Sequence, residues 1–244
     1  GPVDFAALAD CYRSRAGFAL VHAFDAGSAV GSPALTNRRL ARVVAAHPDV
    51  LAGLGCVDPD RGEAAVVAAH DALRMGLRGL FFHPAAQRFD PAGRRSAPLW
   101  DMAEQLRLPV VVHCGTTSLG SGQPGGGGIA LDVADPLRMD RVAARHPDLQ
   151  IVLTGLTPPF EEAAMVVARH KANVHLAPGG GPPDLLASRL REALVGPLAS
   201  SAMIGSGFPF ATPERWLEGW ASLEPDEDAD RKVRRENAER LFAL

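Results

Sequence analysis

Three histidines each stand at the end of a segment that the sequence predicts to be a buried strand. His113 ends the segment 110–113, His83 ends 77–83 and His22 ends 18–22. Apolar runs bounded by Pro or Gly are typical of parallel strands that are covered by helices. Because chemistry in a barrel of parallel strands lies where the strands end, we predict that these imidazoles meet at one mouth. They would form an acid–base cluster there or, as the alternative, a three-histidine metal site.

Two charged residues follow these strand ends. Arg88 comes after the His83 strand, and its planar guanidinium is suited to clamping a substrate carboxylate. Asp25 comes after His22 in the same way. Both are substrate-binding candidates, with a solvated loop side chain as the alternative. The glycine-rich loop 120–128 lacks the Lys-Ser/Thr pair of a phosphate site, so we interpret it as a flexible lid or, alternatively, a disordered loop.

The alternation of side chains along a strand predicts which residues share a face. If His113 faces the barrel interior, Cys114 faces away, and we interpret this cysteine as a small buried residue rather than a nucleophile. By the same alternation, we expect Phe81 and His83 to face the barrel interior together. On a later strand we expect three residues to face inward, namely Ile151, Leu153 and Gly155. The helical histidines are interpreted as surface or capping residues, and His175 is left unassigned: His47, His70, His146 and His170.

Composition limits the classes of protein that the chain can belong to. With 244 residues, 47% hydrophobic and 22% charged, residues 1–244 suit a single α/β domain. A net charge of -3 provides no basic face, so we expect no nucleic-acid partner. No apolar run is long enough to span a membrane. Three widely separated cysteines (Cys11, Cys56 and Cys114) indicate reduced thiols and a cytoplasmic location.

Predicted strands and helices alternate along the whole chain. Strands are predicted at 18–22, 51–57, 77–83, 110–113, 150–155, 173–176 and 201–205, and helices at 4–15, 37–46, 62–75, 98–106, 136–145, 160–170, 185–194 and in the tail 226–244. These are seven βα units, which predicts a TIM-type (β/α) barrel with its first strand unaccounted for. A barrel that lacks a strand exposes an edge of its sheet. We expect a terminal segment of the chain, or the partner subunit of a homodimer, to cover this edge.

Many short segments occur in a family-specific order. They are Ala46-His47-Pro48, Val57-Asp58-Pro59, Gly76-Leu77-Arg78-Gly79-Leu80 with His83-Pro84, Leu108-Pro109 with Val112-His113, Ala144-Arg145-His146-Pro147-Asp148, Asn173-Val174, Ile204-Gly205-Ser206 with Phe208-Pro209-Phe210, Thr212-Pro213-Glu214-Arg215-Trp216, and Glu236-Asn237-Ala238 with Arg240-Leu241. Over nearly the whole chain the sequence resembles the amidohydrolase-related (ACMSD-like) family of the amidohydrolase superfamily. The resemblance implies a TIM barrel and a metal-dependent hydrolase or non-oxidative decarboxylase acting on products of aromatic-acid breakdown.

The chain departs from that family at the metal ligands. The family has a His-x-His pair on its first strand, a His ending the fifth, a His ending the sixth and an Asp ending the eighth. The chain begins after the first strand, and His113 keeps the fifth-strand position. The sixth position reads Gly155 and the eighth Gly207, and neither has a side chain to bind a metal. Because a catalytic zinc takes about three protein ligands, we expect no metal cofactor.

The two glycines also suggest a changed pocket. Deleting both side chains would open volume at the barrel mouth, so we hypothesise that the mouth admits a bulkier ligand than the metal enzymes accept. The hydroxyl groups of Thr154 and Thr157 would donate hydrogen bonds at the place where a metal-binding side chain of the family is missing. The substrate-binding candidates are Arg88, Asp25, Thr154, Gly155, Thr157, Gly207 and Phe208.

The residues and the resemblance together favour a metal-independent enzyme for a small organic substrate of specialised or aromatic-acid metabolism. The accessible chemistry is isomerisation, cyclisation, elimination, decarboxylation or hydrolysis by proton transfer. His113 would be the general acid or base, His83 would shuttle or orient a proton, and His22 would complete the cluster. Two alternatives stay open: an inactive paralogue that binds a small ligand or serves as a subunit beside an active barrel, and a hydrolase with a relocated metal site on His22, His83 and His113.

Overall fold

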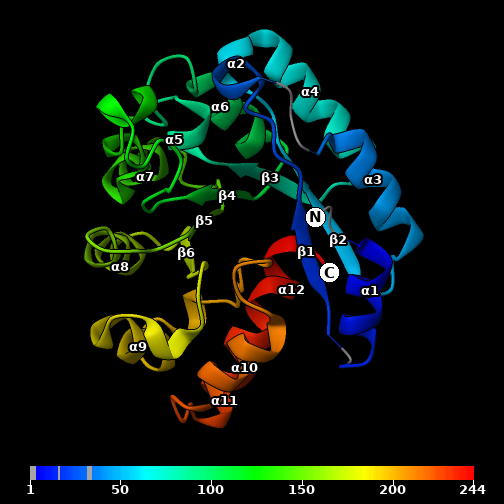
Figure 1. Cartoon of the computed structure of the whole chain (residues 1–244), viewed down its shortest axis with the longest axis vertical. Coiled ribbons are helices and arrows are strands. Elements are labelled where there is room, and N and C mark those ends of the chain that lie inside the picture. Colours follow the sequence, from blue (N-terminus) through cyan, green and yellow to red (C-terminus); the bar gives the residue numbers. More distant parts are fainter. Residues whose placement is uncertain (1–3, 16, 32–34) are drawn as a thin grey trace.

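The computed structural model describes residues 4–15, 17–31 and 35–244. Its strands form one parallel sheet in chain order, and each strand is hydrogen-bonded to the next one along the chain. The sheet curls into a half-barrel of TIM type with helices outside it (Figure 1). The strands are β1 (Ala19–His22), β2 (Leu51–Gly55), β3 (Gly79–Phe82), β4 (Val110–His113), β5 (Ile151–Thr154) and β6 (Val174–Ala177).

Helices connect the strands and surround the sheet (Figure 1). They are α1 (Phe5–Arg13), α2 (Gly27–Val30), α3 (Asn37–Ala46), α4 (Glu63–Arg74), α5 (Pro84–Gln87), α6 (Ala97–Gln105), α7 (Pro136–Arg145), α8 (Glu161–His170), α9 (Ser188–Val195), α10 (Pro213–Ala221), α11 (Glu227–Arg231) and α12 (Asn237–Phe242). Short turns of 3-10 helix include η2 (Pro124–Gly128), η4 (Pro183–Leu185) and η5 (Ala199–Ser201).

Side-chain caps explain where several helices begin. Thr36 accepts a hydrogen bond from the backbone N–H of Arg39 at the start of α3, and Asp135 accepts one from Leu137 at the start of α7. Pro136 occupies the first position of α7, where its missing N–H costs nothing. The bounds predicted for these two helices are therefore confirmed to the residue.

The sheet separates two hydrophobic clusters. Val110 and Val112 of β4 pack outward against the helices, whereas Val111 belongs to a smaller cluster on the inner face. Cys114 is buried in the outer cluster, as predicted. Phe81 of β3 lies in the inner cluster beside Val111, which confirms its inward orientation.

The face predicted for β5 is wrong. Val152 lies in the inner cluster, while Ile151 and Leu153 pack in the outer one. The register agrees, because Val152 pairs with the inward residue Val111. The prediction assumed that the alternation of faces continues from Ile151 through Gly155. Gly155 has a left-handed φ of +68°, and this conformation interrupts the alternation.

The predicted seventh strand at 201–205 is also wrong. Only one parallel bridge forms there, between Ala202 and Leu176. The side-chain amide of Asn237 donates hydrogen bonds of 2.7 and 2.6 Å to the carbonyl oxygens of Ala199 and Ala202. These backbone groups therefore bind helix α12 instead of continuing the ladder of the sheet.

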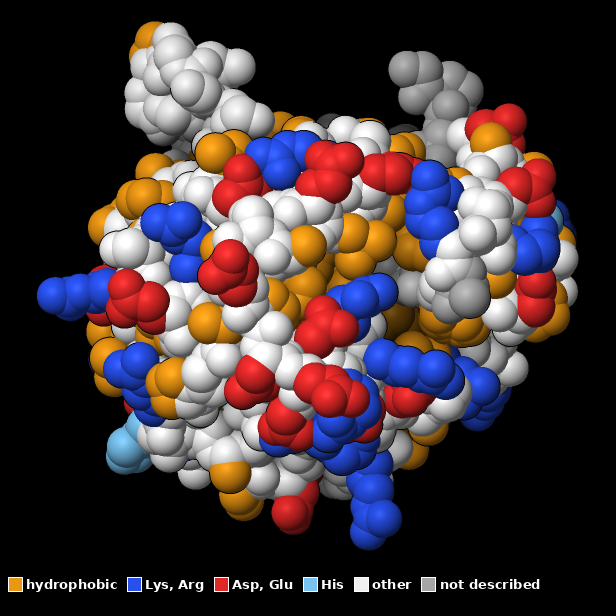
Figure 2. Space-filling model, turned by 90° about the horizontal axis from the view of Figure 1, so that it is seen from below, with side chains coloured by type: hydrophobic (Ala, Val, Ile, Leu, Met, Phe, Trp, Pro, Cys, Tyr) orange, Lys and Arg blue, Asp and Glu red, His pale blue; other side chains and the backbone are white. Residues whose placement is uncertain are grey.

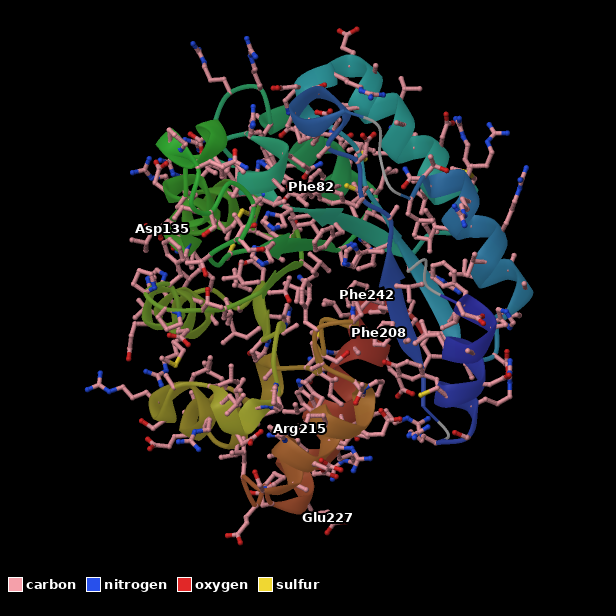
Figure 3. The ribbon with its side chains drawn as sticks, viewed as in Figure 1. Phe82, Asp135, Phe208, Arg215, Glu227 and Phe242 are labelled. Carbon is pink, nitrogen blue, oxygen red and sulfur yellow. The ribbon has the colours of Figure 1, made fainter. Side chains whose placement is uncertain are left out.

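Helices α10 and α12, from the C-terminal end of the chain, lie between β1 and β6 (Figure 1). Phe242 of α12 packs in the inner cluster with Ala177 of β6, and Leu20 of β1 lies against the same cluster. Figure 3 shows Phe242 near the middle of the half-barrel. On the outside, Cys11 of α1 donates to Glu214 of α10 at 3.4 Å. Segments of this chain thus cover part of the open edge, and the homodimer stays a prediction.

The surface carries charges of both signs. Figure 2 shows Lys and Arg interspersed with Asp and Glu on one face, around a central hollow that is lined by apolar side chains. This face has no large patch of a single sign. Within the described residues, every helix is too short or too polar to cross a bilayer.

Candidate active site

Three imidazole rings gather at the carboxyl ends of β1, β3 and β4. The ring of His22 stacks on Phe81, with centroids 3.8 Å apart and planes 18° from parallel. The ring of His83 stacks on His113 at 4.0 Å and 13°. Phe81 and His83 are alternate residues at the end of β3, so the two stacked pairs lie next to each other on the inner face. The structure therefore brings together the three histidines singled out in the sequence.

The ring of His83 is held by the turn that follows it. Its Nδ1 accepts a hydrogen bond from the backbone N–H of Ala86 at 3.4 Å. Its own backbone N–H donates to Oε1 of Gln87 at 2.8 Å. Phe24 lies against the ring with its centroid 6.4 Å away in an edge-to-face arrangement. The turn therefore fixes the position of the imidazole, and Phe24 from the segment after β1 packs against one side of it.

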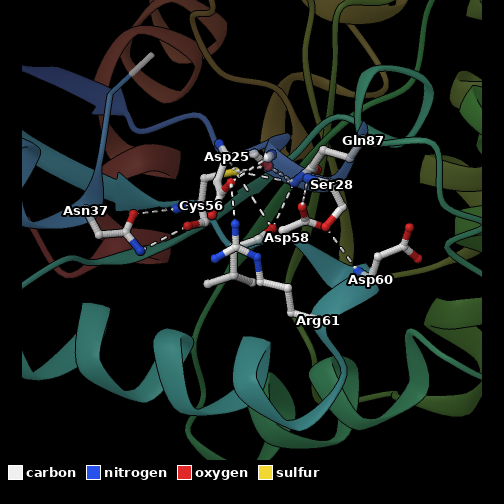
Figure 4. Close-up of polar contacts among 10 residues, drawn as sticks. Asp25, Ser28, Asn37, Cys56, Asp58, Asp60, Arg61 and Gln87 are labelled. Carbon is white, nitrogen blue, oxygen red and sulfur yellow. Dashed lines mark hydrogen bonds and ion pairs between the residues drawn. The ribbon is translucent and has the colours of Figure 1, made fainter. Parts of the chain in front are cut away.

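Gln87 is fully buried and joins three strand ends (Figure 4). Besides accepting from His83, its side-chain amide donates to the carbonyl oxygens of Asp25 at 2.6 Å and Val57 at 2.8 Å. These two residues follow β1 and β2, so a single amide links the loops after β1, β2 and β3. No role for Gln87 was predicted from the sequence. The available signal was an uncharged polar residue four positions after a strand-end histidine.

The ring of His113 fills the space beside Gly155. A Cβ atom on Gly155 would lie 2.2 Å from Nε2 of His113. A Cβ on Gly207 would lie 2.7 Å from the backbone nitrogen of Gly180. The hypothesis that these two glycines open volume at the mouth is therefore wrong, because an imidazole and a neighbouring loop already occupy that volume. Nδ1 of His113 is buried and has no hydrogen-bond partner among the described residues.

Desolvation keeps the central pair neutral at physiological pH. Burial lowers the pKa of His83 to about 3, and positive charge on His113 or His22 would lower it further. Burial lowers the pKa of His113 to about 4, with a smaller contribution from His22. Both rings therefore act as neutral imidazoles near pH 7.

The two candidate threonines bind other parts of the protein. The hydroxyl of Thr154 donates to the carbonyl oxygen of Ala177 at 2.7 Å. The hydroxyl of Thr157 accepts from the backbone N–H of Thr116 at 2.9 Å and lies 2.8 Å from its hydroxyl. The contacts of Thr157 join the loops that follow β4 and β5, and that of Thr154 joins the ends of β5 and β6. Thr154 also pairs with His113 in the register of the sheet, so it stands beside the cluster.

The remaining candidates lie in the surrounding loops. Arg88 donates from its guanidinium to the carbonyl oxygen of Gly127 at 2.9 Å, which attaches the glycine-rich loop to the turn after β3. Asp25 accepts from the backbone N–H of Gly27 at 3.0 Å and lies 3.9 Å from Arg61. Figure 4 shows this carboxylate in the polar network around Gln87. Phe208 is 42% exposed, and Figure 3 shows it near Phe242 in this view.

These residues do not fit the metal site that the family resemblance implies. Gly155 and Gly207 provide no donor atom at two of the expected positions. His83 and His113 are stacked face to face, whereas ligands of one ion point their nitrogens towards a common centre. Across residues 4–15, 17–31 and 35–244, no group of three His, Cys, Asp or Glu side chains could hold a metal ion. The relocated three-histidine site therefore has no support in this geometry.

The comparisons with known proteins agree with the fold. A family model described as Amidohydrolase matches residues 8–244, so the chain belongs to the amidohydrolase family. No match is found among the curated proteins.

Several solved structures share the fold. An uncharacterised TIM-barrel protein from Bordetella bronchiseptica is 24% identical with a TM-score of 0.79, covering 93% of this chain and 78% of the other. The 2,6-dihydroxybenzoate decarboxylase from Rhizobium is 16% identical with a TM-score of 0.66, covering 100% of this chain and 80% of the other. A dihydroxybenzoic acid decarboxylase from a Polaromonas species, solved with bound manganese and an inhibitor, is 16% identical with a TM-score of 0.63, covering 99% and 77%.

Proposed function

We propose that this member of the amidohydrolase family is a metal-independent enzyme that performs acid–base chemistry on a small organic substrate. The observation that carries the proposal is the convergence of His22, His83 and His113 at the ends of three strands. Positioned imidazoles that move a proton in the transition state contribute roughly 10²–10⁴-fold to a rate. The mouth of the half-barrel is where the fold places such chemistry.

The substrate class follows from the surroundings of the cluster and from the similar structures. The rings of Phe24 and Phe81 flank the imidazoles and provide an uncharged, aromatic wall. Two of the similar structures are decarboxylases of dihydroxybenzoates. We therefore favour an aromatic or other planar acid as substrate, with the guanidinium of Arg88 near the mouth as the group that would meet its carboxylate.

The absence of donor atoms at Gly155 and Gly207 supports chemistry without a metal ion. Proton transfer by neutral imidazoles needs no Lewis acid when the substrate itself carries an electron-withdrawing group. Isomerisation, elimination and decarboxylation of an activated acid are all compatible with this requirement. The protein itself supplies the proton acceptor, the proton donor and the desolvated surroundings of the imidazoles.

Turnover of probe acids before and after treatment with a chelator tests the proposal. The probes are 2,6-dihydroxybenzoate and 5-carboxyvanillate, the substrates named for two similar decarboxylases. We expect turnover that survives the chelator and falls at least about 100-fold in His113→Ala. Turnover that disappears with the chelator and returns with manganese would overturn metal independence. Saturable binding of a probe without turnover would instead support the ligand-binding paralogue.

A further inference from the structure

Hydrogen bonds fix which nitrogen carries the proton in two of the three rings. Nδ1 of His22 lies 3.1 Å from the carbonyl oxygen of Ala23. Since a carbonyl oxygen only accepts, Nδ1 of His22 carries the hydrogen and Nε2 keeps a free lone pair. In His83 the roles are reversed: Nδ1 accepts from the N–H of Ala86, so the hydrogen of the neutral ring is on Nε2. The two rings therefore offer one acceptor and one donor.

We propose that His22 and His83 divide the acid–base work on an enolisable carbonyl compound. Nε2 of His22 removes a proton from the carbon next to the carbonyl group, and the Nε2–H of neutral His83 donates a hydrogen bond to the carbonyl oxygen. This proposal rests on the proposed function and narrows it to one substrate class and one type of step.

The spacing of the rings suits such a substrate. His22 stacks on Phe81, and His83 follows two residues later on the same face. Alternate residues of a strand are separated by ~7 Å. A carbonyl oxygen and its neighbouring carbon are two bonds apart, so a substrate between the rings can place one within reach of each Nε2. As a residue, His22 is exposed, as a base that meets a substrate must be.

The environment of His83 keeps it a hydrogen-bond donor rather than a proton donor. Its ring is enclosed by His113 on one face and by Phe24 at its side. Desolvation lowers the pKa of its imidazolium to about 3, so the ring is neutral and keeps its Nε2 proton at pH 7. A neutral imidazole in this state can stabilise the oxyanion of an enolate through a hydrogen bond. Stacked on it, His113 acts as a positioning residue, and the loss of turnover expected in His113→Ala follows from the loss of this stack.

The step balances without a further reactant. When the C–H bond breaks, its proton goes to His22 and its electron pair forms a carbon–carbon double bond. The π electrons of the carbonyl group move to oxygen, where the hydrogen bond from His83 stabilises the negative charge. The imidazolium of His22 then returns its proton to a carbon of the delocalised anion. The product is an isomer when the proton returns to a different carbon, or the same compound with an exchanged hydrogen when it returns to the original one. His22 is then neutral again.

The tautomers can be measured without any substrate. Long-range ¹H–¹⁵N spectra of histidine-labelled protein at pH 7, assigned with His22→Gln and His83→Gln, report which nitrogen of each ring is protonated. We expect His22 protonated on Nδ1 and His83 on Nε2. The opposite tautomer for either ring, or a positively charged ring at pH 7, would overturn the proposal.

Hydrogen exchange in D₂O tests the division of roles. The probes are phenylpyruvate and cyclohex-3-en-1-one, with the spontaneous exchange rate subtracted. We expect His22→Gln and His22→Leu both to slow exchange by more than about 100-fold, because neither side chain is a base. His83→Leu should do the same, whereas His83→Gln keeps an N–H donor and should lose only about 10-fold. Equal losses in the two His83 variants would overturn the donor role.

The outcomes separate this proposal from the proposed function. Decarboxylation of the probe acids with no exchange next to a carbonyl would overturn the division of roles and leave the proposed function intact. The absence of both exchange and turnover would overturn both.

Discussion

The imidazole of His113 occupies the volume that a side chain at Gly155 would need. The ideal Cβ position of Gly155 lies 2.2 Å from Nε2 and 2.3 Å from Cδ2 of this ring. The same ring stacks on His83 at 4.0 Å. The glycine at the end of β5 is therefore a condition for the stacked pair, since a side chain there would overlap the His113 ring and disturb its stack on His83.

Gly155→Ala should destabilise the protein and displace His113. Its φ of +68° disfavours alanine, and the methyl group would overlap the ring. We expect a loss of ~2–4 kcal/mol in the free energy of unfolding, from left-handed strain and overpacking together. Denaturant unfolding measures it. Gly76→Ala is the matched control, because Gly76 has a φ of +87° with open space around it, and should lose only about 1 kcal/mol. Equal losses in both variants would contradict the steric explanation.

Gln87→Leu should loosen the ends of three strands at once. The change leaves the backbone N–H of His83 and the carbonyl oxygens of Asp25 and Val57 without their buried partner. We expect a loss of about 2–4 kcal/mol in the free energy of unfolding and a changed NMR environment for the His83 ring. Asn237→Leu is the control, because it removes another buried amide at the opposite end of the fold. It should cost a comparable amount of stability and leave the spectrum of His83 unchanged.

The sequence predicted the alternating βα order because local signals determine it. Val110 to Val112 form an uninterrupted apolar run, and Asp135 with Pro136 marks a helix start. Continuous alternation also placed His83 and His113 on one face. The prediction failed for Leu153, because the left-handed Gly155 broke the count on which it depended.

Long-range hydrogen bonds account for the other differences. The segment 201–205 has the composition of a strand, but the amide of Asn237 binds the carbonyl oxygen of Ala202 within it and that of Ala199 just before it. The contact of Arg88 with Gly127 and the three bonds of Gln87 also join residues far apart in the chain. A single sequence shows the polar residue types but not which distant groups they meet.

Manganese should not stabilise the protein. A ligand that binds only the folded state raises the melting temperature, and the increase grows with the ratio of ligand concentration to Kd. Gly155 and Gly207 supply no ligand atoms for such binding. We expect equal melting temperatures in EDTA and in manganese chloride, measured by calorimetry. A concentration-dependent increase with manganese, abolished in His113→Asn, would contradict this prediction and indicate that the family position still binds a metal.

Acid should destabilise the fold through His175. Burial lowers the pKa of this inward-facing residue to about 4, and the positive charge of Arg240 contributes. Below the unfolded value of 6.5 the unfolded chain binds a proton that the folded chain does not, so stability is complete above pH 6.5 and falls towards pH 4. Each pH unit in this window costs up to about 1.4 kcal/mol per such group. The pKa values of His83 and His113 are also lowered by burial, so these two residues destabilise the fold in acid in the same way.

Denaturant unfolding at pH 5 and pH 7 measures this dependence. His175→Gln removes one of the titrating groups, so the difference in unfolding free energy between the two pH values should be smaller than in the wild type. An unchanged difference would show that His175 takes up its proton in the folded state as readily as in the unfolded chain.

Arg88→Ala should release the glycine-rich loop without unfolding the barrel. The guanidinium donates to the carbonyl oxygen of Gly127. Glycines 125–127 adopt left-handed conformations, which residues with side chains rarely adopt. We expect faster amide hydrogen exchange over residues 120–128 and a stability change of less than about 1 kcal/mol, because the contact is exposed.

Arg95→Ala is the matched control. Like Arg88, Arg95 is an exposed arginine of the connection between α5 and α6, and its nearest acidic partner is Asp60 at 3.8 Å. Faster exchange in both variants would show a general effect of lost charge. A change confined to Arg88→Ala, together with a raised KM for the probe acids, would assign this side chain both to the loop and to the carboxylate of the substrate.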